Sequence, residues 1–145
     1  MSAKISWMIY EDETYLPYNT YMADGTYSAN DVITRRIQVW NNYQGISSVD
    51  DIVNAKLVLS FKNFEDNFLL HLINVKVGNN DWVYPNIDTD RGVIEMRDLS
   101  GLANNGSLAN AENYCDIEFR IGPLPANIKC ELKSLYFYLE YGRQQ

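Results

Sequence analysis

Short segments in which apolar and polar residues alternate recur along most of this chain. In Asn113–Ile121 every second residue from Cys115 onward is apolar, and Asn54–Phe61 repeats the pattern. A period of two residues is typical of a β-strand with one buried face. Apolar residues nowhere keep a helical spacing for three turns, although a short helix within Leu99–Ala111 stays open. The sequence therefore predicts an all-β protein with less than about a tenth of its residues in α-helix.

Clusters of Gly, Pro and Asn separate the expected strands, because these residues supply the backbone conformations that turns need. The segment Trp82–Tyr84 is expected to stop at Pro85, since proline has no N–H for a ladder hydrogen bond. About seven or eight short antiparallel strands without a long helix favour an antiparallel β-sandwich, either immunoglobulin-like or jelly-roll-like. The expected strands are Ile5–Tyr10, Ile33–Trp40, Asn54–Lys62, Phe68–Gly78, Trp82–Tyr84, Gly92–Arg97, Asn113–Ile121 and Ile128–Tyr141.

The alternation also indicates which residues face the core. Cys115 shares a face with Phe119, so we expect a small core residue and not one half of a disulfide with Cys130. In the last segment the apolar positions change from even to odd numbers, which requires a β-bulge or bend near Lys133–Ser134. The expected inward residues are Ile37, Val39, Leu57, Leu59, Phe61, Ile73, Val75, Ile117, Phe119, Leu135, Phe137 and Leu139.

The first part of the chain differs from the rest. Only Ile5–Tyr10 has a strand pattern there, whereas residues 11–31 combine acidic and turn-forming residues with several tyrosines. We therefore predict a tyrosine-rich N-terminal arm with one strand, residues 1–31, and a β-sandwich domain, residues 32–145. Disordered segments are poor in aromatic residues, so the arm is expected to lie on a partner subunit or on the sandwich. The sheet edges offered by Ile5–Tyr10 and Leu135–Tyr141 are the expected contacts.

The net charge narrows the choice of partners. The chain carries a formal charge of −7, and its twelve basic residues are scattered. Binding to a phosphate backbone needs concentrated Lys and Arg, so we expect no nucleic acid and no membrane as a partner. No stretch is long enough for a transmembrane helix, and the start of the chain lacks the pattern of a signal peptide. We therefore expect synthesis in the cytoplasm.

Residues suited to catalysis or metal binding are sparse. His71 is the one histidine, and its leucine-rich surroundings predict a strand position with a packed ring. No serine-hydrolase, zinc-protease or phosphate-loop motif occurs. Asp88 and Asp90 could offer calcium ligands, but the other positions of an EF-hand loop are missing, which favours an ordinary turn. The sequence thus predicts that the chain is not an enzyme and has no catalytic residue, cofactor or metal.

Aromatic residues are the remaining signal, with eleven tyrosines in the chain. Tyrosine combines a large apolar ring with a polar end, which suits interfaces as well as cores. Trp40 and Tyr138 are expected on outward faces, where either the chain itself or an assembly partner would cover them. The expected interface residues are Tyr15, Tyr18, Tyr21, Tyr27, Trp40, Tyr136 and Tyr138.

A carbohydrate-binding module is the alternative, because exposed aromatic rings beside polar side chains also form platforms for ligands. Carbohydrate is then the partner in place of a protein. The residues of this platform would be Trp40, Trp82 and Tyr84, with the polar neighbours Asn79, Asn80 and Asp81.

Three stretches carry a resemblance to known proteins: TRRIQVWNNYQG from residue 34, VNAKLVLSFKNFEDNFLL from residue 53, and the closing LKSLYFYLEY. In the order of its strands and the composition of its turns, the chain resembles immunoglobulin-like or cohesin-like β-sandwich modules of bacteriophage virion proteins. The Cys…Trp…Cys arrangement of antibody domains is absent, because Trp40 precedes both cysteines. The resemblance implies a viral structural protein of the virion, such as a capsid decoration, tail or baseplate subunit. Its partners would be copies of itself or another virion protein, and no functional residues carry over.

Overall fold

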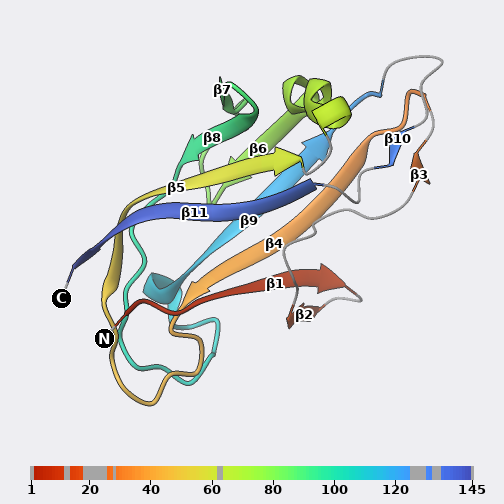
Figure 1. The fold of residues 1–145 in the computed structure, drawn as a ribbon. Coiled ribbons are helices and arrows are strands. Elements are labelled where there is room, and N and C mark those ends of the chain that lie inside the picture. Colours follow the sequence, from red (N-terminus) through yellow and green to blue (C-terminus); the bar gives the residue numbers. More distant parts are fainter. Residues whose placement is uncertain are drawn as a thin grey trace.

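The computed structural model describes residues 2–11, 14–17, 26–27, 29–61, 64–124, 130–131 and 135–144. Strands dominate this part of the chain, and its two helical segments are short 3₁₀ helices (Figure 1). The elements are β1 (Ile5–Glu11), β2 (Thr14–Pro17), β3 (Thr26–Tyr27), β4 (Ile33–Asn41), β5 (Asp51–Phe61), η1 (Phe64–Leu72), β6 (Ile73–Val77), β7 (Asn86–Asp88), β8 (Arg91–Glu95), η2 (Ala111–Asn113), β9 (Tyr114–Ile121), β10 (Cys130–Glu131) and β11 (Leu135–Gln144).

The strands form two main antiparallel sheets that face each other (Figure 1). One sheet has the order β2-β1-β4-β9-β6, and the other has the order β11-β5-β8-β7. A further small sheet pairs β10 with β3. This arrangement confirms the prediction of an all-β antiparallel sandwich with very little helix.

One hydrophobic core fills the space between the two main sheets. The aromatic rings of Phe119 on β9 and Phe137 on β11 approach across it, with centroids 6.2 Å apart. Trp7 on β1 packs edge-on against Phe137 at 4.4 Å. Every residue of the expected inward set is buried, apart from Leu135, whose side chain lies outside the described part. The alternation of the sequence therefore placed the strand faces correctly.

The strand expected at Phe68–Gly78 is wrong in its first half. Residues up to Leu72 belong to η1, and β6 begins only at Ile73. Leu69 and Leu70 are both buried, although they are neighbours and would lie on opposite faces of a strand. A short continuous apolar run does not distinguish a strand from a buried helical turn, which explains the error. His71 consequently lies on η1 with an exposed side chain, and not in a strand with a packed ring.

Other strand boundaries also differ from expectation. The segment Trp82–Tyr84 contributes a single bridge from Val83 to Val75, and the short strand β7 was not expected. The loop after Leu99 contains no helix before η2. The bulge expected near Lys133–Ser134 lies outside the described residues, whereas a register shift occurs in β11 between Glu140 and Gly142.

The N-terminal strand is an integral part of the larger sheet. β1 pairs with β4 on one side and with β2 on the other, so β2 lies on the edge offered by β1, as expected for the arm. The division into residues 1–31 and 32–145 stays a prediction. Cys115 is buried with a free thiol, as expected for a core residue. None of the described helices has the length and apolar character needed to cross a membrane.

Three buried asparagines hold together the long loops at one end of the sandwich. The side-chain amide of Asn42 donates to the carbonyl oxygens of Ser47, Gly101 and Leu102 at 2.8, 3.0 and 3.3 Å. Asn41 and Asn113 make similar bonds from their amides to backbone carbonyls. Because buried carbonyl groups need donors, these amides substitute for ladder pairing where the chain is irregular.

Candidate functional site

One opening in the sandwich lies beside Pro85, at the end of the β7–β8 ladder. The ladder between β7 and β8 ends at the pair Asn86 and Val93, and the next residue toward the N-terminus is Pro85. Pro85 is buried against Gly92, where an added Cβ would come within 2.8 Å of the proline Cβ. The chain before Pro85 leaves β8 and pairs Val83 with Val75 in the other sheet. The last two residues of β8, Ile94 and Glu95, therefore pair with β5 but have no neighbouring strand on the β7 side.

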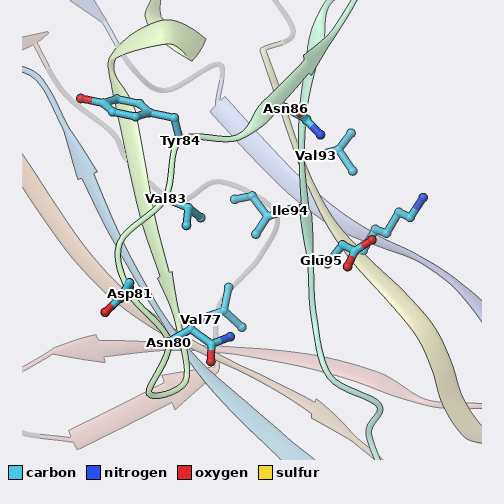
Figure 2. A pocket seen from close by; sticks show the side chains of 10 residues that line it. Val77, Asn80, Asp81, Val83, Tyr84, Asn86, Val93, Ile94 and Glu95 are labelled. Atoms are coloured by element: carbon cyan, nitrogen blue, oxygen red, sulfur yellow. The ribbon is translucent and has the colours of Figure 1, made fainter.

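A cleft of about 400 Å³, here called the flank cleft, lies where the two sheets separate (Figure 2). Its centre is apolar, and the side chains of Val83 and Ile94 point toward each other across it (Figure 2). Val77 and Val93 complete this apolar centre. The polar rim consists of Lys56, Asn80, Asp81, Tyr84, Asn86 and Glu95. The volume falls in the range of about 300–1,000 Å³ that is typical of small-molecule sites.

The polar side chains of the rim are available to a ligand. Lys56, Asn80, Asp81, Asn86 and Glu95 are exposed, and none makes a side-chain hydrogen bond or ion pair within the described residues. The side chain of Arg97, by contrast, donates to the backbone carbonyls of Ala111 and Tyr114. The described part of the chain contains no group of three or more His, Cys, Asp or Glu that could hold a metal ion.

The backbone of β8 also has unused hydrogen-bonding groups at the flank cleft. The N–H of Met96 donates to Ala55 on β5 at 2.9 Å. Backbone groups of successive strand residues point to opposite sides, so the N–H and C=O of Glu95 point away from β5, toward the cleft. Within the described residues these two groups have no partner, since the β7 ladder has already ended.

The expected aromatic platform for carbohydrate is not brought together. Trp40 lies in β4, away from the flank cleft, and the guanidinium of Arg120 covers the ring of Trp82 at 4.2 Å. Tyr84 does line the cleft, as Asn80 and Asp81 do, but its ring points away from the apolar centre (Figure 2). Only part of the expected platform therefore reaches one site, and carbohydrate binding stays an untested prediction.

Trp40 is covered by its own chain, and this corrects its expected place in an interface. Only 1% of its surface is exposed, because Tyr114 lies directly opposite it on β9 and Tyr43 follows in the next turn. The ring centroids lie 4.6 and 4.9 Å from that of Trp40. Its indole N–H donates to Gln38 at 2.7 Å. Trp40 thus has no free ring face to offer a partner.

Tyr136 and Tyr138 lie on the outward face of β11, as expected. Both are half-buried, and their stacked rings, here called the tyrosine stripe, have centroids 6.1 Å apart. Arg91 on β8 donates to the Tyr138 hydroxyl at 3.4 Å and also pairs with Glu140. Val58, the outward residue opposite Tyr138 on β5, is fully buried. The tyrosine stripe is therefore partly covered and partly open.

The remaining expected interface residues are only partly described. The backbones of Tyr15 and Tyr27 form part of β2 and β3, and their side chains lie outside the described part. Tyr18 and Tyr21 lie wholly outside it. Sequence reasoning missed Lys56, Asn86 and Glu95 as residues of the flank cleft. Outward positions on strands were the only signal for them, and that signal does not show which strand lacks a neighbour.

Together, the fold and these surfaces define an antiparallel β-sandwich with an open flank and a partly exposed aromatic edge. No protein-family model and no curated protein matches the chain. A solved structure described as "AvmM Catalyzes Macrocyclization in Alchivemycin A Biosynthesis" is similar, with 12% identity and a TM-score of 0.36. The match covers 94% of this chain and 93% of that one.

This comparison corrects one expectation. The prediction that the chain is not an enzyme is contradicted, because the protein with the similar structure is described as a catalyst. At a TM-score of 0.36 the likeness carries no argument about a reaction or its residues.

Proposed function

We propose that this protein is an assembly protein that packs on copies of itself through the edge strand β11. The observation that carries the proposal is that β11 spans ten residues and pairs, among the described strands, with β5 alone. The other edge strands of the two main sheets are short or shielded. β2 and β7 have four and three residues, and the bridge at Val83 shields β6. A long open edge is a template for pairing with another chain.

The sequence of β11 is suited to antiparallel pairing with itself. With the two-fold axis at Tyr138, Phe137 of one copy lies opposite Leu139 of the other, and the two Tyr138 side chains face each other. Tyr136 then lies opposite Glu140, where its hydroxyl can donate to a carboxylate. Directly opposite residues share a face in an antiparallel pair, so this register continues both the core and the tyrosine stripe.

The virion is the setting that we propose for this assembly. The support is the resemblance of three sequence stretches to β-sandwich modules of bacteriophage virion proteins. A capsid decoration, tail or baseplate subunit is present in many copies, so mass spectrometry of purified phage particles should detect peptides of this chain in stoichiometric amounts. Their absence from particles that carry the gene would contradict the proposed setting.

Size-exclusion chromatography with light scattering tests self-association. We expect the unmodified chain to form a dimer or larger assembly and Tyr138→Lys to be monomeric, because the two-fold axis would bring two like charges together. Tyr136→Lys is the matched variant, and it should still associate because its ammonium lies opposite Glu140. Circular dichroism checks that both variants fold. A monomeric unmodified chain, or equal behaviour of the two variants, would overturn the proposal.

A further inference from the structure

The flank cleft combines three features that nothing in the proposed self-association uses. Its centre is a small apolar slot between Val83 and Ile94 (Figure 2). One wall is the end of β8, where the backbone N–H and C=O of Glu95 face the cleft without a partner among the described residues. Its rim carries two carboxylates, those of Asp81 and Glu95, and one ammonium, that of Lys56 opposite Glu95 on β5.

Each feature selects a property of the occupant. A backbone donor and acceptor side by side on a strand edge are satisfied by another extended backbone, as in β-strand addition. A slot lined by valine and isoleucine accepts an aliphatic side chain, because burying its apolar surface is favourable. Two carboxylates against one ammonium leave the rim with a net negative charge that favours a neighbouring positive charge, and the net charge of −7 favours a cationic occupant over longer distances.

We infer that the flank cleft binds an extended peptide segment of a partner protein, which pairs with β8 beyond the end of β7. An aliphatic side chain of the segment enters the slot between Val83 and Ile94. A lysine or arginine two positions away remains on the solvent side of the same face, within reach of Asp81 or Glu95. The site is available because the β7 ladder ends at Asn86 and the chain before Pro85 pairs Val83 with Val75 in the other sheet.

Val83 is a suitable residue to alter, because its side chain lines the slot. Its side chain is 43% exposed although its backbone is bonded in both directions to Val75, at 2.8 and 2.9 Å. A substitution there changes the slot while the backbone bridge remains. Val32 provides a matched control, since it is a valine of similar exposure, 52%, that does not line the cleft.

The probe is the synthetic peptide acetyl-KVKIKVK-amide, in which aliphatic and basic residues alternate. Titration into ¹⁵N-labelled full-length protein should shift the backbone amides of Asn80–Tyr84 and Val93–Glu95 in a saturable manner. Binding should also slow hydrogen exchange of the Glu95 amide at least about tenfold, because that amide gains a hydrogen bond. The acidic peptide acetyl-EVEIEVE-amide has the same pattern and should bind at least about tenfold more weakly, a difference of about 1.4 kcal/mol.

Val83→Arg should weaken binding of the basic peptide at least about tenfold, whereas Val32→Arg adds the same charge and should leave binding nearly unchanged. The spectrum of each variant without peptide reports whether it is folded. The inference is overturned if the basic peptide gives no saturable shifts up to about 1 mM, the weak end of specific affinities. Shifts outside the cleft, or equal binding by the two variants or by the two peptides, would overturn it as well.

Discussion

Replacing Asn42 by aspartate should destabilise the protein severely, although the two side chains have the same shape. Asn42 is 2% exposed, and its amide nitrogen faces three carbonyl oxygens at 2.8–3.3 Å. An amide has two hydrogens, so about two full hydrogen bonds are lost at about 1 kcal/mol each. The carboxylate would also be buried opposite three oxygens without a counter-charge, which costs about 1–3 kcal/mol more. We expect a loss of about 3–5 kcal/mol at neutral pH.

Urea unfolding monitored by tryptophan fluorescence measures this loss, because Trp40 lies in the strand that leads into this loop. The control is Asn79→Asp, which makes the same chemical change at an exposed residue and should alter stability by less than about 0.5 kcal/mol. Asn42 has a positive φ of 61°, a conformation that aspartate also tolerates, so backbone strain does not contribute. A loss below about 1 kcal/mol for Asn42→Asp would refute the idea that this amide holds the loops together.

The loss should also depend on pH in a defined direction. Burial among carbonyl oxygens would raise the pKa of the introduced carboxyl above its unfolded value of about 3.9. The folded state then binds the proton more tightly than the unfolded state, so the deficit grows as pH rises above about 4 and shrinks as pH falls toward that value. Asn42→Ala introduces no titratable group, so its deficit relative to the unmodified protein should stay constant between pH 4 and pH 7.

Three further experiments test buried side chains. Phe119→Ala removes a fully buried ring at the centre of the sandwich and should cost about 3–5 kcal/mol in urea unfolding; a loss well under 1 kcal/mol would mean that the strand faces are misplaced. Burial raises the pKa of the Cys115 thiol, so peptide mass spectrometry should find it unmodified after treatment of the native protein with iodoacetamide and labelled after unfolding. Fast labelling of Cys115 in the native protein would contradict its buried position. Trp40→Phe leaves the side-chain oxygen of Gln38 without its indole donor and should cost about 1–3 kcal/mol, and an unchanged midpoint would show that the bond is unimportant.

The local alternation of apolar and polar residues was sufficient to predict the strands that have one buried face. In β9 and β11 the alternation of apolar and polar residues predicted both the strand and the face, and Phe119 and Phe137 meet in the core as expected. It failed for η1, because consecutive apolar residues such as Leu69 and Leu70 carry no period. The alternation of apolar and polar residues in β11 also placed the tyrosine stripe correctly on its outward face.

The candidate site depended on relations that a linear pattern does not contain. Lys56, Asn80 and Glu95 come from three separate segments, and they line one cleft only because β8 extends beyond the end of β7. The sequence indicated that Pro85 would end a strand, but not that this would leave an open edge beside the second sheet.

The sequence by itself determined the all-β class, the inward residues and the turns, since a period of two and the residues Gly, Pro and Asn act over a few neighbouring positions. Only the tertiary structure decided which outward residues are covered. Trp40 points away from the core, yet it is buried because the register of β4 against β9 sets Tyr114 opposite it. Tyr138 also points outward, yet it stays half-exposed because β11 is at the edge of its sheet. Pairing between distant strands determines exposure on the outer faces, and the local sequence does not encode that pairing.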